Sequence, residues 1–175
     1  MNTSLVLTVL GPDRPGLVRS LAEQIAAAGG NWLEGRMATL AGQFAGVVLV
    51  ELPAERASSL VTSLRALESQ GLRVTVDSGA SGPPPSAGRV AQLELVGQDR
   101  PGIVRDVSRV LADRGVSVEQ LDTGTASAPF SGESLFQARA RLRLPAPLSV
   151  ESLRAALQAL ANELMADIKV DETLG

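Results

Sequence analysis

The stretch "GPDRPG", residues 11–16, lies between two hydrophobic segments, and a near copy, "GQDRPG", follows at residues 97–102. When the chain is aligned with itself at this offset of 86 residues, seven of the nine positions that begin at Gly11 and Gly97 are identical. Repetition at a fixed offset is typical of a duplicated structural unit. The sequence therefore predicts two homologous domains.

The segment "DSGASGPPPSAG", residues 77–88, separates the two copies and consists mostly of Gly, Pro and Ser. Glycine and serine make a chain flexible, prolines stiffen it, and none of them builds a hydrophobic core. We therefore expect a first domain at residues 1–77, a linker at residues 78–88 and a second domain at residues 89–175.

Both domains show the same order of hydrophobic patterns, in which period-two segments alternate with segments of helical spacing. In the first domain the order predicts strand, helix, strand, strand, helix and strand over residues 5–10, 18–29, 31–40, 43–52, 60–70 and 72–76. The second domain repeats it over residues 90–96, 104–111, 116–126, 134–144, 150–164 and 166–172, with Ser149 as the expected N-cap of the last helix. This order predicts an α+β fold of two ferredoxin-like βαββαβ domains, each a four-stranded antiparallel sheet with two helices on one face.

The composition excludes much catalytic chemistry, because the chain has no Cys and no His. Three carboxylates, Asp13, Glu34 and Glu119, are conceivable acid–base groups, but no spacing fixes any two of them together and no nucleophile has a partner. We therefore expect that the protein is not an enzyme and needs no cofactor or metal.

Charge and hydropathy limit the partners as well. A formal net charge of −3 and an aromatic content of 2% argue against direct binding of nucleic acid. The N-terminal segment lacks the basic region of a signal peptide, and no apolar run approaches the ~18 residues that cross a bilayer. We expect a soluble cytoplasmic protein without membrane contact.

Two predicted strands have unusual faces. Arg139, Arg141 and Arg143 alternate with apolar residues in "FQARARLRL", which predicts an arginine face that is either solvated or a docking surface for an acidic partner. In contrast, "GVVLVEL", residues 46–52, is apolar on both faces. We expect the second face of this first sheet to be covered by the other domain or by a second chain, as in a homodimer.

The repeated turn has chemistry suited to a zwitterion. Pro15 and Pro101 suit a first helical turn, and the glycine that follows each proline leaves the backbone amides uncovered. A helix N-terminus attracts a carboxylate, while the adjacent Asp13 or Asp99 can hold an ammonium group. An α-amino acid presents both charges. The alternative is that these residues only shape the turn from strand to helix.

The order of elements, the DRPG turn after the first strand and the "NW" pair of "GGNWLE" together resemble the ACT domain family, present here twice. In that family the regulatory site lies in the loop after the first strand and at the start of the second strand, often at a domain interface. The resemblance therefore implies six ligand-binding residues: Asp13, Gly16 and Asn31 in the first domain, and Asp99, Gly102 and Ser117 in the second. Serine has fewer donors than asparagine, so we expect the second site to bind less well.

The resemblance also implies a function. We expect a non-catalytic regulator that senses a small amino acid such as glycine and modulates transcription through a partner, a transcriptional activator or another regulatory protein. The alternative is a ligand-free interaction module that uses the arginine face or residues 46–52, and a ligand titration separates the two.

Overall fold

The computed structural model describes residues 1–79, 88–127 and 133–173. The chain divides into two compact units, Met1–Gly82 (unit 1) and Pro83–Gly175 (unit 2). Most of the expected linker, residues 80–87, lies outside the described residues. None of the helices in the described ranges is both long enough and apolar enough to span a bilayer.

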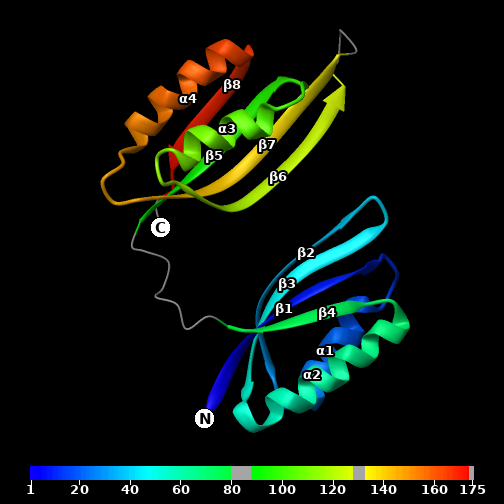
Figure 1. The fold of residues 1–175 in the computed structure, drawn as a ribbon. Helices are drawn as coiled ribbons and strands as arrows, with labels where there is room; N and C mark the ends of the chain where they lie inside the picture. The colour runs from blue at the N-terminus through cyan, green and yellow to red at the C-terminus, as the bar shows by residue number, and fades with distance from the viewer. Residues whose placement is uncertain (80–87, 128–132, 174–175) are drawn as a thin grey trace. The chain divides into compact units, whose positions relative to one another are not determined.

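Unit 1 is a βαββαβ fold (Figure 1). Its elements are β1 (Asn2–Pro12), α1 (Leu17–Ala27), β2 (Asn31–Leu40), β3 (Gln43–Pro53), α2 (Ala57–Ala66) and β4 (Arg73–Ser78). Two short 3₁₀ segments, η1 (Ala54–Arg56) and η2 (Leu67–Gln70), flank α2. The strands form an antiparallel sheet in the order β2-β3-β1-β4.

Unit 2 repeats this architecture. Its elements are β5 (Arg89–Gln98), α3 (Ile103–Ala112), β6 (Ser117–Ser127), β7 (Ser134–Leu144), α4 (Val150–Leu164) and β8 (Ala166–Glu172), and the antiparallel sheet has the order β6-β7-β5-β8. Ser149 caps α4 as expected, because its hydroxyl accepts a hydrogen bond from the Ser152 amide at 3.1 Å.

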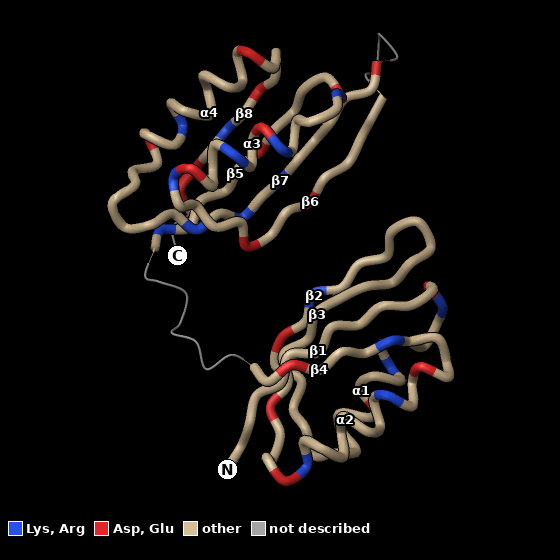
Figure 2. Tube along the Cα trace, in the orientation of Figure 1, with Lys and Arg blue, Asp and Glu red and all other residues tan. Residues whose placement is uncertain are grey.

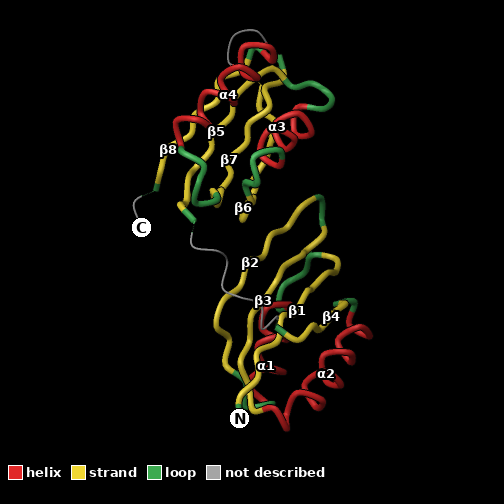
Figure 3. Tube along the Cα trace, turned by 60° about the vertical axis from the view of Figure 1, so that its left-hand side comes forward, coloured by secondary structure: helices red, strands yellow, loops and turns green. Residues whose placement is uncertain are grey.

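In each unit the two helices lie on the same face of the sheet (Figure 1, Figure 3). The predicted α+β fold of two four-stranded antiparallel sheets, each with two helices, is therefore confirmed. Each sheet buries alternate side chains against its helices, as Leu7 and Val9 show on β1 and Leu93 and Leu95 show on β5.

The outer face of the unit 1 sheet is more apolar than a solvated face requires. On β3, Val48 and Val50 are fully buried under the helices, whereas Val47 on the opposite face is 48% exposed. Its neighbours on that face, Val6 and Leu49, are partly buried. Both helices of unit 1 cover the inner face, so coverage of the outer face by the other unit or by a second chain stays a prediction.

Candidate functional site

The DRPG turn of unit 1 leads into α1 through a glycine in the left-handed region. Gly16 is the N-cap of α1 and has φ 93°. Apart from Gly16 itself and its two chain neighbours, no residue has a heavy atom within 4 Å of the position that a Cβ on Gly16 would take. The prediction that Pro15 belongs to the first helical turn was wrong, because this glycine separates the proline from Leu17, where the helix begins. The same holds for Pro101, since Gly102 has φ 91° and α3 begins at Ile103.

Two hydrogen bonds hold the unit 1 turn against its neighbours. The Asp13 amide donates to the Gly42 carbonyl at 2.9 Å. The Arg14 guanidinium donates to the Gln70 carbonyl of η2. The turn is therefore fixed on one side by the β2–β3 hairpin and on the other by the segment that precedes β4.

The start of α1 remains uncapped. The first amide that bonds back to the turn is that of Ser20, which donates to the Gly16 carbonyl at 2.9 Å, and the N-cap supplies no side-chain acceptor. The amides of residues 17–19 precede the first intrahelical hydrogen bond, and such groups suit an anion. An open turn with a carboxylate three residues before the N-cap can therefore receive the two charges of an amino acid.

The unit 2 turn has a different environment, built around Asp106. This residue is the one buried charged side chain among the described residues. It accepts a hydrogen bond from Arg105 Nε at 3.0 Å, and the guanidinium groups of Arg100 and Arg109 each reach it at 3.8 Å. The hydrogen bond from Arg105 lowers the pKa of Asp106 most, and the charges of the three arginines add to the shift against the opposing effect of burial.

Arg105 also lies over the turn itself. A Cβ on Gly102 would be 2.9 Å from its guanidinium, whereas the space beside Gly16 is open. The Asp99 amide donates to the Ser134 carbonyl at 2.9 Å, which parallels the bond from Asp13 in unit 1. The two turns thus share a backbone geometry and differ in the side chains that surround it.

The structure does not bring Asn31 to the turn of its own unit. Asn31 lies opposite Glu51 on β3, and Glu51 lies opposite Ser4 near the start of β1. Pro12, which directly precedes Asp13, is eight residues farther along β1, or about 26 Å at ~3.3 Å per residue. One amino acid cannot span that distance.

The same separation holds in unit 2. Ser117 lies opposite Arg143, and Arg143 lies opposite Val90, near the start of β5. Asp99 directly follows the other end of β5 at Gln98. The structure therefore groups Asp13 with Gly16 and Asp99 with Gly102, and it places Asn31 and Ser117 at the opposite end of their sheets.

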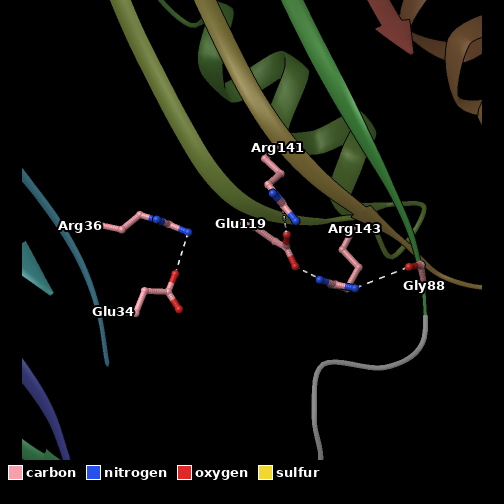
Figure 4. A network of polar contacts seen from close by, with 6 residues as sticks. All are labelled: Glu34, Arg36, Gly88, Glu119, Arg141 and Arg143. Carbon is pink, nitrogen blue, oxygen red and sulfur yellow. Dashed lines mark hydrogen bonds and ion pairs between the residues drawn. The ribbon is translucent and has the colours of Figure 1, made fainter. Parts of the chain in front are cut away.

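The arginine face of β7 is paired with carboxylates. Glu119, at a register shift in β6, binds Arg141 Nε at 3.0 Å and also Arg143, which donates to the Gly88 carbonyl at 3.5 Å (Figure 4). Arg139 pairs with Glu94 on β5 at 3.3 Å. Burial works to raise the pKa of Glu119, but the hydrogen bonds from Arg143 and Arg141 outweigh it and the pKa is lowered.

The three carboxylates considered for acid–base chemistry lie on separate elements. Glu34 on β2 pairs with Arg36 at 2.8 Å (Figure 4), Asp13 lies in the turn after β1, and Glu119 belongs to unit 2. The described residues contain no group of three or more His, Cys, Asp or Glu side chains placed to hold a metal ion.

Sequence reasoning missed the Asp106 cluster. The sequence pattern that could have revealed it is an aspartate at a buried position of α3, with Arg105 one residue before it and Arg109 three residues after it. In unit 1 the corresponding residue is Ser20.

Comparison with known proteins now defines the class. Two βαββαβ units with a glycine-capped turn after the first strand match models of the ACT domain at residues 3–77 and 91–162. The chain therefore belongs to the ACT domain family and carries two of its domains in tandem.

The similarity to individual proteins extends over nearly the whole chain. The chain is 24% identical over 166 residues to the glycine cleavage system transcriptional repressor of Escherichia coli (strain K12), with 93% of this chain and 86% of the repressor covered. A crystal structure of an unknown protein from Galdieria sulphuraria has a TM-score of 0.89 at 31% identity, covering 99% of this chain and 100% of the other. A structure provisionally described as a glycine cleavage system transcriptional repressor has a TM-score of 0.74 at 18% identity, covering 100% and 99%, and shares the fold.

Proposed function

We propose that this protein is a non-catalytic regulator that senses a small amino acid, with glycine as the first candidate, through the turn of unit 1. The observation that carries the proposal is the uncapped start of α1 beside Asp13, with open space at Gly16. The similarity to a transcriptional repressor over 93% of the chain supports a regulatory output. The output passes through a partner regulatory protein in the cytoplasm, such as a transcriptional activator.

The proposed binding mode follows from the charges of the turn. The amino acid carboxylate accepts hydrogen bonds from the first amides of α1, and its ammonium group pairs with the Asp13 carboxylate. Gly16 leaves room for the ligand backbone to approach, because no side chain stands there. The ligand needs no cofactor or metal.

Asn31 contributes from a second chain in this proposal. β2 is an edge strand, and it runs in the same direction as β1 because both are antiparallel to β3. When the β2 strands of two copies pair in antiparallel fashion, the start of one lies beside the end of the other. That end is the one that carries the DRPG turn, so the homodimer places Asn31 of one copy near Asp13 of the other.

Calorimetric titration with the twenty amino acids tests this function, with glycine and serine first. We expect saturable binding that Asp13→Asn weakens while the melting temperature without ligand stays at the wild-type value. If no amino acid binds, the sensor proposal fails. The protein is then a ligand-free interaction module, for which the exposed Val47 on the outer face of the first sheet supplies a contact surface.

A further inference from the structure

The two turns carry different net charges at positions related by the internal repeat. Ser20 of unit 1 corresponds to Asp106, and Glu23 corresponds to Arg109. Around the unit 1 turn the charges of two arginines, one aspartate and one glutamate sum to zero: Arg14, Arg19, Asp13 and Glu23. Around the unit 2 turn three arginines and two aspartates leave one positive charge: Arg100, Arg105, Arg109, Asp99 and Asp106.

The unit 1 arginines are already engaged. The Arg14 guanidinium donates to the Gln70 carbonyl, and Arg19 Nε lies 2.7 Å from Glu23 one helical turn later. Each unit 1 arginine thus has a partner of its own. The Arg19 side chain is nevertheless 82% exposed, so the contrast with unit 2 lies in the net charge of the turn.

The unit 2 arginines keep donors for a further anion. Only Arg105 is within hydrogen-bond distance of Asp106, and Arg100 and Arg109 stand at 3.8 Å from it. The side chains of Arg100 and Arg109 are 42% and 67% exposed, so solvent or a ligand reaches their remaining N–H groups. Charged residues of both signs gather along α3 and the turn that leads into it (Figure 2).

The arginines of β7 have a larger share of carboxylate partners than the unit 2 turn arginines have. Glu94 and Glu119 between them engage Arg139, Arg141 and Arg143, so two carboxylates serve three arginines there. Around Asp106 a single carboxylate pairs with three arginines, one from the turn and two from α3, and this cluster borders the turn at Gly102 rather than the open face of a sheet.

We propose that the unit 2 turn binds an amino acid with an acidic side chain, aspartate or glutamate, whereas the unit 1 turn binds a neutral one. The inference rests on the proposed function, since it names the ligand class of the second turn. Asp99 pairs with the ammonium group, and Arg105, which lies over Gly102, faces the α-carboxylate. Arg100 and Arg109 bind the side-chain carboxylate. The net charge of −1 on the ligand then matches the net charge of +1 on the turn.

The test is calorimetric titration of the full chain with aspartate, glutamate, asparagine and glutamine, in the wild type and in Asp13→Ala, which disables the first turn. We expect aspartate or glutamate to bind Asp13→Ala about tenfold more tightly than the uncharged amides, because exposed charge pairs contribute modestly. The preference should shrink as salt is raised, since salt screens exposed charges.

Two variants of one residue locate the specificity. Arg109→Glu introduces the residue type found at Glu23, and Arg109→Gln removes the charge without adding repulsion toward Asp106. Both should lower the affinity for aspartate, the second by roughly threefold to tenfold. Arg114→Gln is the matched control, because Arg114 donates to the Val110 carbonyl at 3.1 Å near the end of α3 and should not affect binding.

The outcomes separate the two proposals. Equal affinities for aspartate and asparagine, or an Arg109→Gln variant that binds aspartate as the wild type does, overturn the acidic ligand. In either case, glycine binding to the wild type, titrated in parallel, leaves the sensor function standing. Failure of every amino acid to bind overturns both. Circular dichroism and the melting temperature without ligand confirm that each variant is folded.

Discussion

Gly16→Ala tests whether the unit 1 turn is both strained for other residues and used by a ligand. The native φ of 93° lies in the left-handed region, which L-residues avoid at a cost of roughly 1–2 kcal/mol. The added methyl group meets nothing within 4 Å, so no steric term adds to this cost. We expect the free energy of unfolding to fall by ~1–2 kcal/mol, measured by urea denaturation and circular dichroism.

Gly29→Ala is the matched control for this change. Gly29 has φ 71° and equally open space, and it lies just past the C-terminal end of α1. The two variants should lose similar stability, but only Gly16→Ala should weaken glycine binding, because its methyl group stands beside the first amides of α1. Trp32, the only tryptophan, packs partly buried against the unit 1 core, and its fluorescence gives a second readout of unfolding. Equal loss of binding in both variants, or no loss of stability in Gly16→Ala, would refute this reasoning.

Three further outcomes are expected. Ser149→Ala removes the acceptor for the Ser152 amide and should lower the free energy of unfolding by about 1 kcal/mol in chemical denaturation. Asp106 has a folded-state pKa below its ordinary value. Its ionised carboxylate therefore stabilises the fold fully at pH values above the unfolded-state pKa of about 4, and this stabilisation is lost as the pH falls through the lowered folded-state pKa. Denaturation curves between pH 6 and pH 3 should therefore show the wild type losing more stability than Asp106→Asn does, and parallel losses would contradict this contribution. The purified protein should not shift DNA in a gel at physiological salt, given its net charge of −3; a specific shift without a partner would contradict the proposed route of regulation.

The fold was largely predictable because its determinants are local. The alternation of "LVLTVL" and the helical spacing of Leu21 and Ile25 report secondary structure within a few residues, and the repeat confirms the order. Even the hydroxyl cap at Ser149 follows from its place before a helical pattern. The position of Pro15 was missed because a left-handed glycine, Gly16, follows the proline and keeps it outside the helix, which begins at Leu17.

The candidate site was less predictable, because it depends on lengths and on partners far along the chain. The sequence shows Asp13 and Asn31 only 18 residues apart, whereas the length of β1 and the register with β3 set them at opposite ends of the sheet. The engagement of Arg14 with the Gln70 carbonyl joins residues 56 positions apart, which no local pattern reveals. Asp106 could have been noticed as an acidic residue at an otherwise apolar position of its helix.

The scaffold requires the glycines of the GxDRPG motif whether or not a ligand is bound. A side chain on Gly11 would overlap the Gly71 carbonyl oxygen, and one on Gly97 would stand 2.7 Å from the Cβ of Ala166, so the first glycine of each copy exists for the close approach of a neighbouring segment. The last glycine exists for its left-handed backbone. Searches of genomes with this motif will therefore retrieve the shape of the turn whatever it binds. Under the ligand classes proposed above, the two copies differ at the positions of Ser20 and Glu23 while keeping the motif intact, so those helix positions, and not the motif, separate the two classes.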